Sequence, residues 1–231
     1  MKKIVLSLCC LCLILASDGK GNHAIAQSAK TMSVDSIEAL YQKDPVAALM
    51  IFRGKAGDLP ATLSDEDAIN WGSARAGAGD FNVMYLLALR YQNVGDYAQA
   101  YRWYAIANAV QSVDSLRCAD ARTTLQNYTY GTARILQQDL AATRTRMKND
   151  TAAYDNAIAE GVALVKRLGP DRMLPFSICT QGKNALKQQA ELMRGQRQSA
   201  NPFEVDLYVS NADWPTIYQK RIEFIEKSLA Q

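Results

Sequence analysis

Acidic side chains are the groups in this chain best suited to chemistry, because paired carboxylates act as acid and as base or nucleophile in glycan cleavage. The candidates are Glu160, Glu191, Glu204 and Asp206. Their sequence neighbours give no sign of the burial that would raise a carboxyl pKa. We therefore expect no catalytic residue and no enzyme, with a carboxylate-based glycan hydrolase as the alternative.

The single histidine, His23, lies in an N-terminal segment with the features of a secretory signal peptide. Two lysines and an apolar run over residues 4–16 precede the small-x-small sequence Ala24-Ile25-Ala26, and that run is too short to cross a bilayer. We expect cleavage after Ala26, with cleavage after Ser17 as the less favoured alternative. The mature chain then lacks histidine, which excludes histidine-liganded metals and serine–histidine or cysteine–histidine nucleophiles. No metal and no cofactor are expected.

Export changes what the charges and the leader cysteines imply. Removing residues 1–26 takes away three lysines and one aspartate, so the net charge falls from +3 to +1. A nearly neutral chain is a poor candidate for binding nucleic acid through its phosphates. Cys9, Cys10 and Cys12 do not follow a small residue, which makes a lipoprotein the less favoured form. We expect a periplasmic or secreted protein whose mature chain does not insert stably into a membrane.

Two cysteines, Cys118 and Cys179, remain after the leader. In an oxidising compartment a disulfide between them would close a long loop and restrain the unfolded chain. Two separate buried thiols are the alternative, because the sequence does not show whether the two Cα atoms lie within bonding distance.

Aromatic residues gather in the middle of the chain, where seven of the eleven tyrosines lie between Tyr85 and Tyr130. Tyrosine and tryptophan provide large rigid contacts with a polar end, as in grooves that bind peptides or glycans. The alternative is that they pack the core of a helical fold. We take the best partner-binding candidates to be Tyr85, Tyr101, Arg102 and Trp103.

The elements that must position these residues are predicted to be helices. Apolar residues recur at helical spacing through most of the chain, and capping residues mark the starts. The expected helices cover about residues 34–43, 46–53, 65–76, 81–93, 97–110, 112–148, 151–168, 180–194 and 214 onward. Residues 203–209 alternate between apolar and polar types, which favours a short extended segment. The predicted fold class is all-α, built from antiparallel helix pairs.

One stretch within residues 71–109 resembles a known repeat. Residues 96–107, which read DYAQAYRWYAIA, are similar to the second helix of a Sel1-like repeat, a relative of the tetratricopeptide repeat. Leu87, Tyr91 and Gly95 match its first helix, and residues 71–77 resemble the end of a preceding unit. The resemblance covers one full unit and implies a helical surface that binds other proteins.

The expected organisation follows from these features. Residues 1–26 form the signal peptide, residues 27–111 carry the N-terminal helices with the repeat, and residues 112–231 form a C-terminal helical extension. The expected function is protein–protein interaction, as an adaptor, assembly factor or scaffold of a bacterial envelope system. Its partner would be another envelope or secretion-system protein or peptide, and not nucleic acid. A glycan-binding or glycan-cleaving protein and a secreted effector or colonisation factor are the alternatives.

Overall fold

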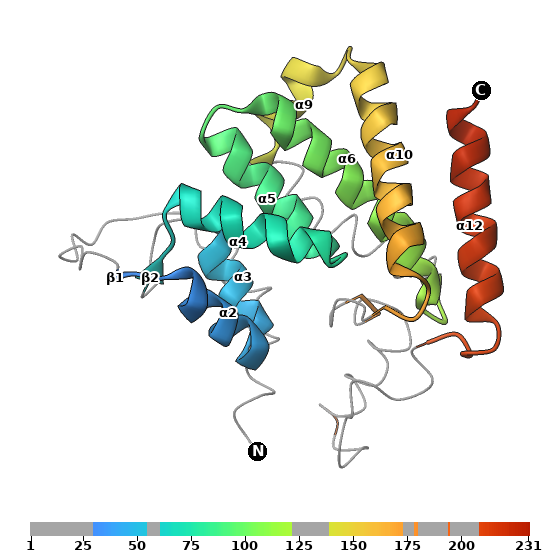
Figure 1. Ribbon diagram of the computed structural model, residues 1–231, viewed down its shortest axis with the longest axis horizontal. Coiled ribbons are helices and arrows are strands. Elements are labelled where there is room, and N and C mark those ends of the chain that lie inside the picture. Colours follow the sequence, from blue (N-terminus) through green and yellow to red (C-terminus); the bar gives the residue numbers. More distant parts are fainter. Residues whose placement is uncertain (1–29, 55–60, 122–138, 173–177, 180–193, 195–207) are drawn as a thin grey trace. The chain divides into compact units, whose positions relative to one another are not determined.

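Helices make up the fold that the computed structural model describes, so the predicted all-α class is confirmed. The structure describes residues 30–54, 61–121, 139–172, 178–179, 194 and 208–231 (Figure 1). The chain divides into residues 1–30 and residues 31–231, and the account below concerns the second of these units. The predicted signal peptide lies outside the described residues.

The first two helices share one capping residue. Helix α2 (Val34–Lys43) begins after Ser33, whose side chain accepts a hydrogen bond from the amide of Ser36. Asp44 ends α2 and also caps α3 (Pro45–Arg53), where its side chain accepts from the amide of Ala47 at 3.0 Å. A proline in the first turn suits such a start, because its missing N–H would have no helical partner there.

The end of α3 depends on a glycine. Gly54 has a φ of +69°, a backbone conformation that residues with a Cβ rarely adopt. A Cβ at this position would also lie 2.6 Å from the guanidinium of Arg90. The two-residue strand β2 (Ala61–Thr62) follows later in the chain, whereas the two-residue strand β1 (Lys30–Thr31) precedes α2. The amide of Met32 donates to the carbonyl of Thr62 at 2.8 Å.

The next three helices form successive antiparallel neighbours. They are α4 (Asp65–Gly77), α5 (Phe81–Asn93) and α6 (Tyr97–Asp114). Ser64, Asp80 and Asp96 cap them by accepting hydrogen bonds from amides of the first turn. Helix α5 has the predicted bounds, whereas α6 continues beyond the predicted end at Val110.

Helix α5 forms the centre of the core. It packs against α3, α4 and α6, and every residue from Phe81 to Arg90 is buried. A helix surrounded on most sides has no solvated stripe, which explains the nearly continuous apolar sequence of this segment. Helix α6 therefore lies between α5 on one side and α10 (Thr151–Leu168) on the other (Figure 1).

The predicted helix over residues 112–148 is wrong at its start. Helix α6 ends at Asp114, a 3-10 turn η2 (Ser115–Arg117) follows, and Cys118 is extended and pairs with Tyr208. Helix α9 (Ala141–Met147) begins later, and residues 122–138 lie outside the described part of the chain. The interruption arises because Cys118 pairs with residues distant in sequence, which helical periodicity does not reveal.

Cys118 and Cys179 form the predicted disulfide, with their Cα atoms 5.3 Å apart. This bond is consistent with an oxidising location outside the cytoplasm. Within the ranges that the structure describes, none of the helices combines the length and hydrophobicity that a bilayer crossing needs. The expected division at residues 111/112 falls inside α6 and stays a prediction.

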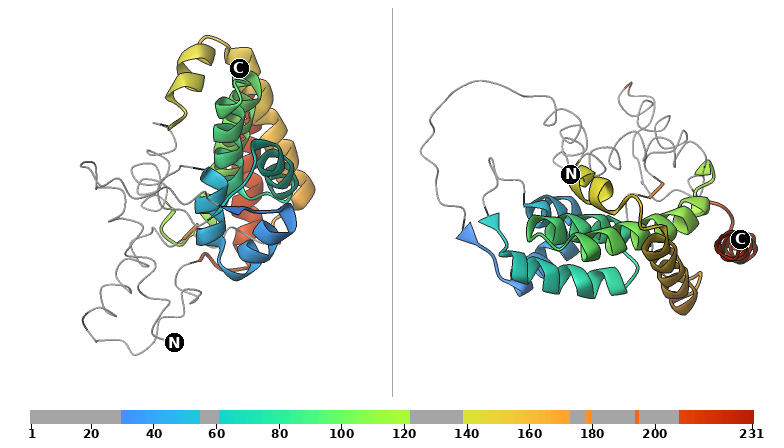
Figure 2. Two further views of the ribbon diagram at one scale, coloured as in Figure 1. Left: turned by 90° about the vertical axis from the view of Figure 1, so that its left-hand side faces the viewer. Right: turned by 90° about the horizontal axis from the view of Figure 1, so that it is seen from above.

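The last helix, α12 (Trp214–Leu229), begins at the predicted position. The side chain of Asp213, which precedes it, makes no capping hydrogen bond, and the hydroxyl of Ser210 accepts from the amide of Asp213 at 3.1 Å. Helix α12 packs against α10 and the end of α6, and Figure 2 shows it from two further directions.

Candidate interaction surface on helices α6, α10 and α12

Tyr85, one of the predicted partner-binding residues, lies in the core between α5 and α6. Its side chain is 2% exposed. Its hydroxyl donates toward the side-chain oxygens of Asn108 at 2.7 Å and Gln111 at 2.5 Å, both on α6. A buried hydroxyl with such partners fixes how the two helices pack, so Tyr85 has almost no surface to offer a partner.

Tyr101 is also mostly covered, with 9% of its surface exposed. Its ring packs against the ring of Tyr154 on α10, with centroids 5.6 Å apart. Burial raises the pKa of the Tyr101 hydroxyl, because an ionised phenolate would lose hydration there. The residue therefore joins α6 to α10 in this structure.

Arg102 and Trp103, the other two candidates, lie together and are only half-buried. The guanidinium of Arg102 lies 5.0 Å from the centre of the Trp103 ring, within range of a cation–π interaction. The same guanidinium donates from Nε to Glu160 of α10 at 2.8 Å and makes a second bond to its other oxygen. The Trp103 indole nitrogen is buried and has no hydrogen-bond partner among the described residues.

A groove lies between α10 and α12. It has a volume of 280 Å³. Its lining residues are Ala159, Val162, Ala163, Lys166, Glu226 and Leu229. The two alanines leave room beside α10, and a salt bridge of 2.8 Å from Lys166 to Glu226 crosses between the helices. The groove is thus an apolar depression with one charge on each wall.

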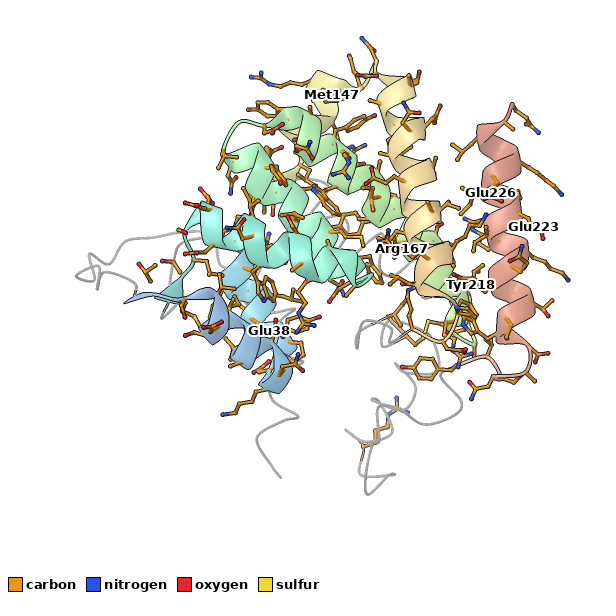
Figure 3. All side chains as sticks on the ribbon, in the orientation of Figure 1. Glu38, Met147, Arg167, Tyr218, Glu223 and Glu226 are labelled. Carbon is orange, nitrogen blue, oxygen red and sulfur yellow. A yellow bond between two sulfur atoms is a disulfide. The ribbon has the colours of Figure 1, made fainter. Side chains whose placement is uncertain are left out.

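The foot of α12 is anchored beside this groove. Tyr218 donates its hydroxyl to the carbonyl of Val165 at 2.6 Å, and the indole of Trp214 donates to the carbonyl of Pro170 at 2.8 Å. Figure 3 labels Tyr218 near the start of α12 and Glu226 nearer its end. The start of the helix is therefore fixed against α10, while its later part forms a wall of the groove.

The groove and the Arg102–Trp103 pair both contact the same stretch of α10. Glu160, the partner of Arg102, directly follows Ala159 of the groove lining. A ligand that covered the exposed side of α10 would thus meet Arg102 on one side and α12 on the other. The groove residues were not predicted, because their grouping depends on the pairing of helices about sixty residues apart in sequence.

The structure describes only one of the four carboxylates considered for catalysis. Glu160 is ion-paired with Arg102 on an exposed surface, and the other three candidates lie outside the described residues. Across the described ranges there is no group of three or more His, Cys, Asp or Glu side chains that could hold a metal ion.

Comparison with known proteins found no relative of this chain. No family model matches the chain, and neither the curated proteins nor the solved structures contain a match. The resemblance to Sel1-like repeats therefore stays a prediction. The structure shows an all-helical fold with packed helix pairs.

Proposed function

We propose that the protein is an exported protein–protein interaction module that binds a segment of another envelope protein over α10. The observation that carries this proposal is the solvent-open apolar groove between α10 and α12. The Arg102–Trp103 pair at the other edge of α10 extends the same surface. A helical repeat resemblance and a disulfide suited to an oxidising compartment agree with such a role.

The lining of the groove indicates what it would hold. Grooves between helices commonly receive the apolar face of an amphipathic helix, which inserts aliphatic or aromatic side chains. Ala159 and Ala163 would admit such a side chain, and Leu229 would cover it. Lys166 and Glu226 now pair with each other at an exposed position, where an ion pair contributes little. Polar groups of the ligand could replace that pair at small cost.

Arg102 and Trp103 would form the second contact. An arginine stacked on a tryptophan combines a flat apolar surface with donors for a carboxylate, and both residue types are common among side chains that dominate binding. The partner is accordingly expected to present an apolar anchor followed by an acidic group. Such binding supports our proposal of an adaptor or assembly role in an envelope system.

Site-specific crosslinking tests the proposal. A photoreactive amino acid replaces Ala163 in the groove, Trp103 at the other edge, or Ala74 on the exposed side of α4 as the matched control. After irradiation of intact cells, one common adduct is expected from positions 163 and 103 but not from position 74. Equal labelling at position 74, or no adduct from either site, would contradict the proposal.

A blocking variant sharpens this experiment. Ala163→Trp fills the groove, so it should abolish the adduct formed from position 103, whereas Ala74→Trp should leave it intact. Circular dichroism verifies that both variants remain folded. Release of soluble fragments from purified peptidoglycan by the wild-type protein would instead favour the glycan-cleaving alternative.

A further inference from the structure

A buried ion pair joins the end of α6 to the segment after α10. Asp114 is the last residue of α6, and its side chain is 0% exposed, while that of Arg172 is 4% exposed. Arg172 donates to one oxygen of Asp114. The other oxygen, Oδ2, and the Nε of Arg172 are buried without a hydrogen-bond partner among the described residues.

This arrangement compensates the buried charge only in part. A carboxylate removed from water needs hydrogen bonds to both oxygens, and one bound arginine satisfies a single oxygen here. Burial accordingly raises the pKa of Asp114 to about 7, although the positive charge of Arg172 opposes the rise. Burying the ionised Asp114–Arg172 pair away from water therefore costs free energy.

The pair lies at the base of α12. Arg172 belongs to residues 169–172, and this segment accepts the Trp214 hydrogen bond through Pro170. The turn between α4 and α5 covers the segment closely: Gly79 has a φ of +93°, and a Cβ there would lie 2.8 Å from Leu168 and 3.2 Å from Arg172. Movement of residues 169–172 would therefore carry the start of α12 with it.

Other charged and titratable groups reach Asp114 from the surrounding elements. Asp80, at the start of α5, adds negative charge that further disfavours ionisation of Asp114. Burial also raises the pKa of Asp80 itself. Tyr218 of α12 interacts with both Asp114 and Arg172, and burial raises the pKa of its hydroxyl, so it stays neutral near pH 7. Arg172 is the cation that opposes these effects.

We propose that the Asp114–Arg172 pair is a pH-sensitive joint, in which protonation of Asp114 tightens the docking of residues 169–172 and α12 as the pH falls from neutral. Lifting the segment would let water reach the carboxylate, so the ionised form favours the open joint. The neutral carboxyl gains much less from water and favours the closed joint, because the cost of burying the carboxylate outweighs its attraction to Arg172. The joint is independent of partner binding, although α12 also forms one wall of the groove.

Hydrogen exchange of the free full-length protein measures this directly. Protection factors of the α12 amides, corrected for the intrinsic exchange rate, are compared at pH 5.5 and pH 8. We expect protection about tenfold higher at pH 5.5, because the closed joint binds a proton that the open joint releases. Amides of α5, in the core, serve as the internal reference.

Two substitutions separate the joint from general effects of pH. Asp114→Asn mimics the neutral carboxyl, so the protection of α12 should become independent of pH. Asp171→Asn, at the exposed neighbour of Arg172, should keep the wild-type difference. An unchanged difference in Asp114→Asn would overturn the proposal, as would wild-type protection that does not rise at pH 5.5.

A second measurement covers the case in which Asp114→Asn does not fold. The carboxyl resonance of Asp114 is followed by carbon NMR through a pH titration of the wild-type protein. A midpoint above pH 6 supports the joint, and a midpoint below pH 5 refutes it. Neither measurement involves a partner, so failure here is distinguishable from failure of the proposed binding function.

Discussion

Glu38 illustrates how much one side chain contributes to joining two helices. Its carboxylate, on α2, accepts hydrogen bonds from two residues of α4. The Trp71 Nε1 and the Arg75 Nε each donate to Glu38 Oε2 at 2.9 Å. Gln42 donates to it from the next turn of α2. Bonding to Arg75 is the main reason that the pKa of Glu38 falls from 4.5 to about 2, while burial acts in the opposite direction.

Folding lowers the pKa of the Glu38 carboxyl. Because its pKa is lowered on folding, the ionised group stabilises the protein above pH 4.5, and this contribution is lost as the pH falls toward 2. Glu38→Gln should therefore lower the Tm near pH 6 and reduce the fall in Tm between pH 5 and pH 2.5. Thermal unfolding followed by circular dichroism measures both. Glu223→Gln, at an exposed site on α12, should change neither.

Single residues also decide which candidates can contact a partner. Tyr101 and Trp103 both belong to the aromatic run of α6, but Tyr101 is buried whereas Trp103 is half-buried beside Arg102. Tyr101 is covered because Tyr154 of α10 packs against it. Local sequence cannot distinguish the two, since the covering residue lies in a different helix.

At the scale of elements, α6 and α10 approach each other closely at Gly161. A Cβ on Gly161 of α10 would lie 2.8 Å from the Cβ of Ala109 and 3.0 Å from the carbonyl oxygen of Ile106. Small residues at such a crossing let two helix backbones pack tightly. Asp96 and Asp150 cap the two helices, so their starts are specified locally while their contact depends on these small residues.

Gly161→Leu should force α6 and α10 apart. Overpacking of this kind costs about 1–3 kcal/mol of unfolding free energy, even though leucine favours a helix over glycine. Chemical denaturation measures the change. Gly77→Ala is the matched control, because a Cβ there meets nothing within 4 Å. The control should be neutral or slightly stabilising, and an equal loss in both variants would contradict this role of Gly161.

At the scale of the whole molecule, the disulfide restrains the chain beyond α6. Cys118 and Cys179 are separated by 61 positions and are both buried. Beside them, the amide of Val209 donates to the carbonyl of Arg117 at 2.9 Å, and the Arg117 guanidinium lies 5.4 Å from the ring of Trp214. The disulfide thus closes the region where the end of α6 meets the start of α12.

Replacing both cysteines by serine should lower the unfolding free energy by about 4 kcal/mol, since a loop of this length loses its restraint in the unfolded state. Denaturant titration of the exported wild-type and of Cys118→Ser/Cys179→Ser measures the difference. Adding a reducing agent to the wild-type in denaturant should reproduce the variant. Equal stability of the oxidised and reduced wild-type would contradict this account.

The sequence by itself determined most of the described helices and their starts. Ser33, Asp44, Ser64 and Asp150 each cap a helix that starts close to its predicted position, because a cap bonds to amides only two or three residues away. The bounds of α5 were likewise predicted, whereas the burial of nearly all its sides emerged only from the structure. Pairing of Cys118 with Cys179 was inferred from their number and compartment, and the structure confirms it.

Only the tertiary structure decided which surfaces stay open. Helix α10 covers Tyr101, α6 covers Tyr85, and α12 completes a groove whose lining gave no local signal. The Asp114–Arg172 pair also depends on a turn after α10 meeting the end of α6. Burial and electrostatic pairing sum contributions from residues far apart in sequence, whereas helix periodicity and capping depend on neighbours within one or two turns. That difference in range is why most of the helices were predictable and the groove between α10 and α12 was not.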